Sequence, residues 1–150
     1  MYYLINKVLI VEDDAYKEEQ IVNYLKSLNN NISITREHSL NSALFNIMRN
    51  MYEIILLDMS IPTFDTNEPE HFKPYGGLMF LDELKRIKSE IPVVIITQFS
   101  KFGEGKNEIT FDQIKEKCSQ KYANYKDTIY FKDNRWKEYL KGYIVEEKND

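Results

Sequence analysis

Acidic side chains follow two strongly apolar segments of this chain. The segments are residues 8–11 and 54–57, and the acids that follow them are Glu12, Asp13, Asp14 and Asp58. Four consecutive apolar residues are typical of a strand that is buried on both faces of a parallel sheet. The acids then emerge together at the carboxyl ends of the strands, where open α/β sheets place their binding sites.

This cluster of acids predicts a bound cation. Carboxylates about 4 Å apart repel each other by several kcal/mol at an effective dielectric of about 20. A cation between them removes that cost, and Mg²⁺ is the first candidate because it prefers oxygen ligands.

Two more apolar strands end in polar side chains. Residues 92–96 run into Thr97, and residues 129–131 run into Lys132. A short alternating strand at residues 32–34 completes a set of five. Because parallel strands end at one edge of a sheet, we expect Thr97 and Lys132 to lie beside the acids.

Helical patterns separate these strands. Apolar residues recur at helical spacing in residues 21–28, 40–48, 78–87, 111–122 and 136–144. Ser39 is placed to cap the second helix, and either Thr110 or Asp112 the fourth. Five strand-and-helix units joined by right-handed crossovers predict an α/β fold, a doubly wound three-layer sandwich.

Four motifs in order carry a family resemblance: VLIVEDD, LLDMSIP, PVVIIT and a lysine that closes the last strand. The chain resembles the response-regulator receiver domain of two-component signalling, in a stand-alone form. The resemblance implies a CheY-like, flavodoxin-like parallel sheet of five strands in the order 2-1-3-4-5. It also implies that residues 1–150 form a single receiver domain.

The resemblance implies a magnesium site. Asp13 and Asp58 would ligate Mg²⁺ directly, the backbone carbonyl of Ser60 would be a third protein ligand, and Glu12 would act through bound water. Asp14 has no such role in the family, so it either caps the first helix or faces solvent.

The resemblance also implies phosphoryl transfer to Asp58 from a phosphohistidine or a small phosphodonor. Lys132 would pair with a phosphoryl oxygen, and Thr97 would hydrogen-bond another and move the loop behind it. The implied partners are a sensor histidine kinase or phosphotransfer protein and an unidentified downstream protein. We expect a signalling domain rather than a true enzyme.

Several segments depart from the family pattern. The loop at residues 63–75 is longer than usual and predicts a lid, a docking surface or a plain solvated loop. Residues 98–110 hold two glycines and predict a flexible loop that rebuilds the output face. Ile129 takes the place of the family's switch aromatic, so the neighbouring Tyr130 should point to the opposite face of the sheet.

The amino-acid composition argues against a nucleic-acid-binding protein and against a membrane-spanning protein. The 150 residues are 43% hydrophobic with a net charge of -4 and dispersed lysines and arginines, which argues against nucleic acid as a partner. The apolar runs are too short for a membrane span. One cysteine, Cys118, and no signal-like amino terminus predict a cytoplasmic location.

Three other functions compete with the phosphorylated receiver. A pseudo-receiver would keep the fold as an interaction module without phosphate control, which Gln98, Ile129 and Asp133 favour and the intact acids oppose. A Mg²⁺-dependent hydrolase of the topoisomerase-primase type would need an acid at Ser60. An FMN-binding flavodoxin would need a phosphate-cradling loop where the chain has carboxylates.

Overall fold

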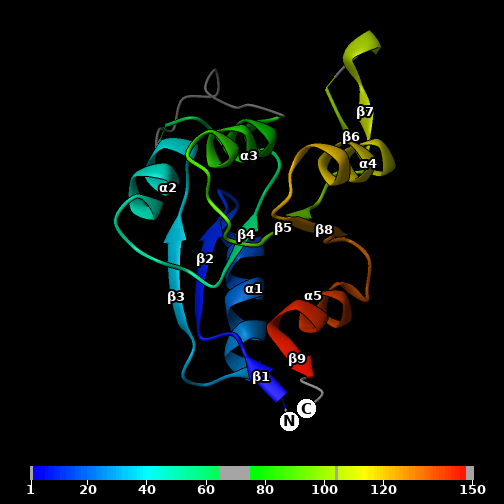
Figure 1. Cartoon of the computed structure of the whole chain (residues 1–150). Helices are drawn as coiled ribbons and strands as arrows, with labels where there is room; N and C mark the ends of the chain where they lie inside the picture. The colour runs from blue at the N-terminus through cyan, green and yellow to red at the C-terminus, as the bar shows by residue number, and fades with distance from the viewer. Residues whose placement is uncertain (1, 65–74, 104, 148–150) are drawn as a thin grey trace.

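A parallel sheet forms the centre of the computed structural model, which describes residues 2–64, 75–103 and 105–147 (Figure 1). Its strands are β2 (Lys7–Val11), β3 (Ser33–Glu37), β4 (Ile54–Leu57), β5 (Val93–Thr97) and β8 (Tyr125–Tyr130). They are parallel and lie in the order β3-β2-β4-β5-β8. This is the predicted order 2-1-3-4-5, so the fold class is confirmed.

Helices cover both faces of the sheet (Figure 1). They are α1 (Ala15–Leu28), α2 (Leu40–Ile47), α3 (Gly76–Arg86), α4 (Phe111–Lys121) and α5 (Trp136–Ile144). Side chains of α1 and α5 share one apolar cluster, and those of α2, α3 and α4 share the other. No helix in the described ranges is both long and apolar enough to cross a membrane.

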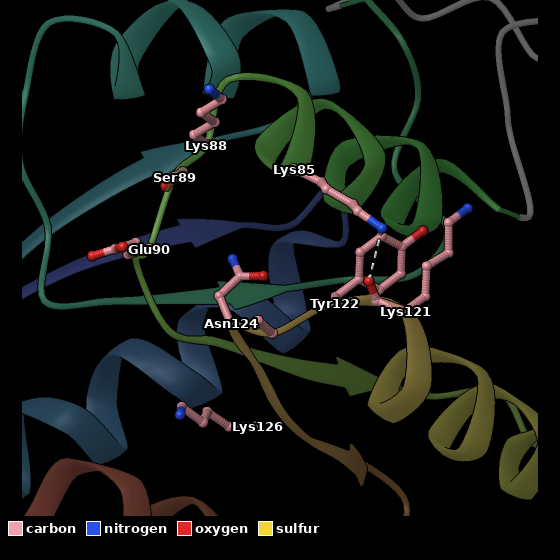
Figure 2. A pocket seen from close by; sticks show the side chains of 9 residues that line it. Lys85, Lys88, Ser89, Glu90, Lys121, Tyr122, Asn124 and Lys126 are labelled. Atoms are coloured by element: carbon pink, nitrogen blue, oxygen red, sulfur yellow. Dashed lines mark hydrogen bonds between the residues drawn. The ribbon is translucent and has the colours of Figure 1, made fainter.

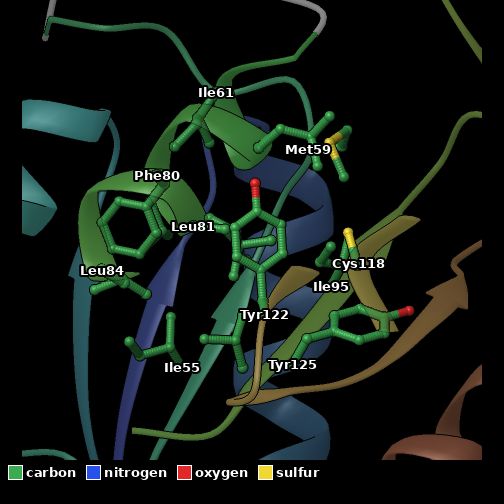
Figure 3. Close-up of a cluster of buried hydrophobic side chains, with 14 of the residues drawn as sticks. Ile55, Met59, Ile61, Phe80, Leu81, Leu84, Ile95, Cys118, Tyr122 and Tyr125 are labelled. Atoms are coloured by element: carbon green, nitrogen blue, oxygen red, sulfur yellow. The ribbon is translucent and has the colours of Figure 1, made fainter. Parts of the chain in front are cut away.

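The two clusters explain the runs of consecutive apolar residues. On β2, Leu9 and Val11 enter the cluster under α2, α3 and α4, whereas Val8 and Ile10 enter the cluster under α1 and α5. Successive side chains of a strand point to opposite faces, so a strand covered on both faces must be apolar at every position. Figure 3 shows the cluster under α2, α3 and α4, in which Phe80 of α3 packs with residues of the sheet.

Helix caps agree with the sequence pattern. Ser39 accepts a hydrogen bond from the backbone N–H of Ser42 at the start of α2, and Thr110 forms a reciprocal capping box with Gln113 at the start of α4. Asp14, whose role the sequence left open, caps α1. The chain therefore enters these helices through the polar residues that the sequence offers for that purpose.

Two small sheets were not predicted. Residues 98–110, predicted to be a flexible loop, contain an antiparallel pair of β6 (Lys101–Phe102) and β7 (Ile109–Thr110), joined through a 3₁₀ turn, η2 (Gly105–Asn107). The prediction of a flexible loop did not foresee that Phe102 is buried in the core, where it anchors this hairpin.

Near the chain ends, β1 (Tyr2–Leu4) pairs with β9 (Val145–Glu147) in the second small sheet. Most of the long loop predicted at 63–75 lies outside the described residues.

Glycine at the start of α3 lets the helix approach the segment that follows β4. A Cβ atom on Gly76 would lie 2.0 Å from the carbonyl oxygen of Ile61, and one on Gly77 would lie 2.8 Å from the Cα atom of Met59. Both neighbours are backbone and cannot rotate away. The N–H of Gly77 also donates to the carbonyl of Met59 at 2.7 Å. These contacts hold the chain just after Asp58.

We predict that Gly76→Ala destabilises the protein by about 1 to 3 kcal/mol, because the added methyl group overpacks a backbone contact. Gly142→Ala in α5 is the matched control, since its Cβ atom would meet open space. That change should raise the free energy of unfolding by roughly 0.5 to 1 kcal/mol. Urea unfolding measures both, and equal midpoints for the two variants would contradict the packing argument.

Candidate functional site

The carboxyl ends of the strands bring the predicted acids to one edge of the sheet. Val11 and Leu57, the last residues of β2 and β4, are register partners, and the N–H of Asp58 donates to the carbonyl of Val11 at 2.9 Å. Glu12 and Asp58 are both buried. A pair of buried carboxylates side by side needs a positive partner.

That positive partner is Lys17, a residue of α1 that the sequence analysis missed. Its ammonium nitrogen lies 2.5 Å from Oε1 of Glu12 and 3.0 Å from Oδ1 of Asp58. It also donates to the backbone carbonyl of Ile96 at 2.5 Å. The side chain is only 1% exposed. An ammonium group has three N–H donors, and these three acceptors satisfy all of them.

The local structure of α1 aims Lys17 at the acids. The carboxylate of Asp14 accepts a hydrogen bond from the backbone N–H of Lys17 at 2.9 Å, so Lys17 is the third residue after the cap. Helical side chains tilt toward the amino terminus, which here points the lysine back over the strand ends. A cation in the first turn opposes the helix dipole. The acids must offset that cost.

A sequence signal for Lys17 did exist. Lys17, Ile21 and Leu25 are spaced four residues apart and are all buried, so Lys17 belongs to the apolar stripe of α1. Lysine is almost never fully buried unless it is paired. A lysine in the buried stripe, shortly after an acidic strand end, therefore indicates an ion pair with those acids.

Charge and burial act against each other in this cluster. Burial would lower the pKa of Lys17, but the charges of Asp58 and Glu12 outweigh burial and raise this pKa above its ordinary value. Burial raises the pKa of the Glu12 carboxyl, and the charge of Lys17 opposes that rise. Oε2 of Glu12 accepts from the backbone N–H groups of Asp13 and Asp14, each at 3.1 Å. Both oxygens of Glu12 are thus engaged.

Lys132 lies outside this cluster. Its side chain is exposed, and no ion pair or hydrogen bond joins it to Asp58 in the described ranges. The preceding residue, Phe131, points inward instead: its ring centre lies 6.0 Å from the Lys17 nitrogen and 4.9 Å from the Trp136 ring. Both residues lie in the turn that follows β8, where Phe131 is partly buried and Lys132 is exposed.

Thr97 sits where β5 meets the β6–β7 hairpin. Its side chain is buried, and its hydroxyl accepts a hydrogen bond from the N–H of Phe99 at 3.2 Å. Its carbonyl accepts from the N–H of Phe131 at 2.7 Å. The last two residues of β8 point to opposite faces of the sheet. Ile129 enters the cluster under α1 and α5, and Tyr130 packs edge to face against Phe111 of α4. The predicted opposite orientation of these two side chains is therefore observed.

The oxygen donors suit Mg²⁺ only in part. Asp13 is exposed beside the site, and the backbone carbonyl of Ser60 accepts no hydrogen bond within the described part of the chain. These two and Asp58 offer the oxygen ligands that Mg²⁺ prefers. Glu12 is committed to Lys17 and two N–H groups. No group of three or more histidine, cysteine or acidic side chains in the described residues is close enough to hold a metal ion.

A separate cavity of about 480 Å³ lies at the opposite edge of the sheet, before the starts of β5 and β8 (Figure 2). Its lining includes Lys85, Lys88, Lys121, Lys126 and Glu90. These are flexible side chains at a surface, and one of them, Lys85, donates to the carbonyl of Lys121 at 3.2 Å. The cavity does not communicate with the acids, which lie at the far ends of the strands.

The family model of the response regulator receiver domain matches residues 8–112, which covers more than half of the chain. The chain belongs to this family. A solved receiver of the same kind, the CheY-like response regulator receiver domain protein from Methanospirillum hungatei JF-1, superimposes with a TM-score of 0.64. It is 14% identical, and the match covers 93% of this chain and 90% of that one. At this identity the likeness shows the receiver fold alone.

Two curated relatives are similar in sequence to this receiver. The Detocs response regulatory protein DtcB of Enterobacter cloacae (strain JD6301) is 24% identical, covering 79% of this chain and 82% of its own. The protein of the same name from Vibrio alginolyticus is 36% identical over 61% of this chain and 65% of its own. These relatives agree with a response regulator in two-component signalling.

We predict that Lys17→Met lowers the free energy of unfolding by about 3 to 5 kcal/mol, because it leaves two buried carboxylates without their cation. Lys132→Met makes the same change at an exposed lysine and should stay within about 0.5 kcal/mol of the wild type. Denaturant unfolding at neutral pH measures both. A similar small effect for the two variants would show that the Lys17 ion pairs do not form in solution.

Proposed function

We propose that this receiver accepts a phosphoryl group on Asp58 from the phosphohistidine of a sensor histidine kinase or phosphotransfer protein. One observation carries the proposal: Asp58 stands at the end of β4 with one oxygen held by Lys17 and the other, Oδ2, without a hydrogen bond or ion pair within the described residues. Such an oxygen is available as a nucleophile, and its position is already set.

The transfer is a displacement at phosphorus. Oδ2 of Asp58 forms the new P–O bond while the P–N bond to histidine breaks, and the leaving nitrogen keeps the electron pair and takes up a proton. Charge spreads over the phosphoryl oxygens during this step, so cations and hydrogen-bond donors around them lower the barrier. Thr97 would supply a hydroxyl donor, and a lysine ammonium group would supply positive charge.

Mg²⁺ is part of the proposal. Asp13, Asp58 and the carbonyl of Ser60 would hold it, with Glu12 further away because its oxygens serve Lys17 and the backbone. When bound, the ion would offset negative charge on the phosphoryl group. Asp13 would also keep the ion near the surface, where a donor protein can approach.

Output would pass through protein contacts. Thr97 connects the acid edge to the β6–β7 hairpin through its hydrogen bond from Phe99. If Thr97 turns toward a phosphoryl oxygen, this bond breaks and the segment that leads from β5 into the hairpin can shift. A downstream protein that binds the hairpin and α4 would respond to this change.

We also propose that the protein is cytoplasmic, which its single cysteine supports.

Phosphorylation can be tested with a small donor. Acetyl phosphate and Mg²⁺ should add one phosphoryl group to the wild type, in a form labile to hydroxylamine, as intact mass spectrometry would show. Asp58→Asn should remove the label because an amide is a poor nucleophile. Asp112→Asn, at an exposed acid of α4, should keep it. A label of the same size in Asp58→Asn would move the acceptor elsewhere.

Metal binding gives a second test. Mg²⁺ should raise the melting temperature of the wild type by mass action, since it binds the folded state. Asp13→Asn should abolish that increase, and Asp112→Asn should leave it unchanged. If Asp13→Asn keeps the full magnesium-dependent increase, Asp13 is not a ligand.

The same labelling experiment examines a second function, an interaction module that works without phosphate. It is favoured because the chain itself supplies a buried cation, Lys17, that pairs with both Glu12 and Asp58. A wild-type protein that takes no phosphoryl group from small donors or histidine kinases would support it.

A further inference from the structure

We propose that Lys17, rather than Lys132, is the lysine that pairs with the phosphoryl group on Asp58. This assignment rests on the proposed function, and it moves the positive group from the end of β8 to helix α1. The lysine expected from the family pattern closes the last strand, so a lysine on α1 changes which element senses the phosphate.

The position of Lys17 supports the assignment. Its nitrogen lies 3.0 Å from Oδ1 of Asp58, and the side chain is almost completely buried. When Oδ2 carries a phosphoryl group, the carboxylate becomes a neutral acyl group and the negative charge moves to the phosphoryl oxygens. These oxygens are bonded to the phosphorus beside Oδ1, so the ammonium needs only a small movement to form a charge-assisted hydrogen bond with one of them.

The environment of Lys132 opposes the usual assignment. The hydrogen bond from the N–H of Phe131 to the carbonyl of Thr97 holds the end of β8 in register. In that register Phe131 fills the inward position, and Lys132 is exposed. For Lys132 to reach Asp58, its exposed side chain would have to leave solvent and enter the side of the site where the Phe131 ring lies against Trp136.

The assignment couples the phosphate to α1 and β5 at once. Lys17 donates to the carbonyl of Ile96, the residue before Thr97. A lysine that moves toward a phosphoryl oxygen weakens that bond at the point where β5 leads into the β6–β7 hairpin. The threonine hydroxyl and the lysine therefore act on the same end of β5.

Two matched variants test the assignment. The initial rate of Asp58 labelling by acetyl phosphate should fall about 100-fold or more in Lys17→Met, the effect typical of losing one donor to a developing oxyanion. Lys132→Met should stay within about twofold of the wild type, as expected for an exposed charge. Equal rates in Lys17→Met and the wild type, together with a large loss in Lys132→Met, would overturn the assignment while leaving the proposed function intact.

A second pair of variants separates a loss of labelling from a loss of folding. Lys17→Met/Glu12→Gln removes one charge of each sign and should restore folding better than Lys17→Met alone. Compared with Glu12→Gln alone, it should still lose about 100-fold in labelling rate. If the double variant is folded and labels as fast as Glu12→Gln, the assignment is wrong.

Spectroscopy of the unmutated protein gives a direct readout. In ¹⁵N-lysine NMR spectra, beryllofluoride with Mg²⁺, a phosphoryl analogue, should shift the ammonium resonance of Lys17 and leave that of Lys132 unchanged. A shift confined to Lys132 would overturn the assignment. No phosphoryl label on the wild type and no beryllofluoride response at either lysine would contradict the proposed function and this assignment together.

Discussion

The Lys17 ammonium between Glu12 and Asp58 constrains the whole edge of the sheet. Two buried carboxylates cannot remain charged beside each other without a cation, and a buried lysine cannot remain charged without acids. Each group therefore requires the other two. The lysine also needs a third acceptor, which the carbonyl of Ile96 supplies. The site is held together by one ion-pair network that joins α1, β2, β4 and β5.

The rest of the fold positions that network. Register between β2 and β4 places the two acids side by side, and the Asp14 cap starts α1 where its third residue can reach them. The aromatic ring of Phe131 lies next to the Lys17 ammonium on the side of the network that faces β8. Tight glycine contacts at α3 hold the chain after Asp58. The response-regulator fold thus places Asp58 at this edge, while its positive partner comes from an unexpected element, α1.

Strand ends and helix caps could be predicted because they depend on local pattern: apolar runs, polar residues that end them, and capping side chains. The strand order came from the family resemblance, since no local pattern determines it. Lys17 was missed because a lysine on a helix is usually solvated, and only its place in the apolar stripe distinguishes it. The orientation of Lys132 depends on the turn that follows β8, which the apolar pattern of the strand cannot determine. The β6–β7 hairpin depends on burial of Phe102 against distant residues, a tertiary contact without a local signal.

The most direct test of the account is a crystal structure of the protein with Mg²⁺ and beryllofluoride bound at Asp58. We expect the Lys17 nitrogen to lie within hydrogen-bonding distance of a fluorine atom, with Phe131 still facing the site and Lys132 still exposed. A structure in which Lys132 contacts the fluorine atoms and Lys17 remains on Glu12 alone would contradict it.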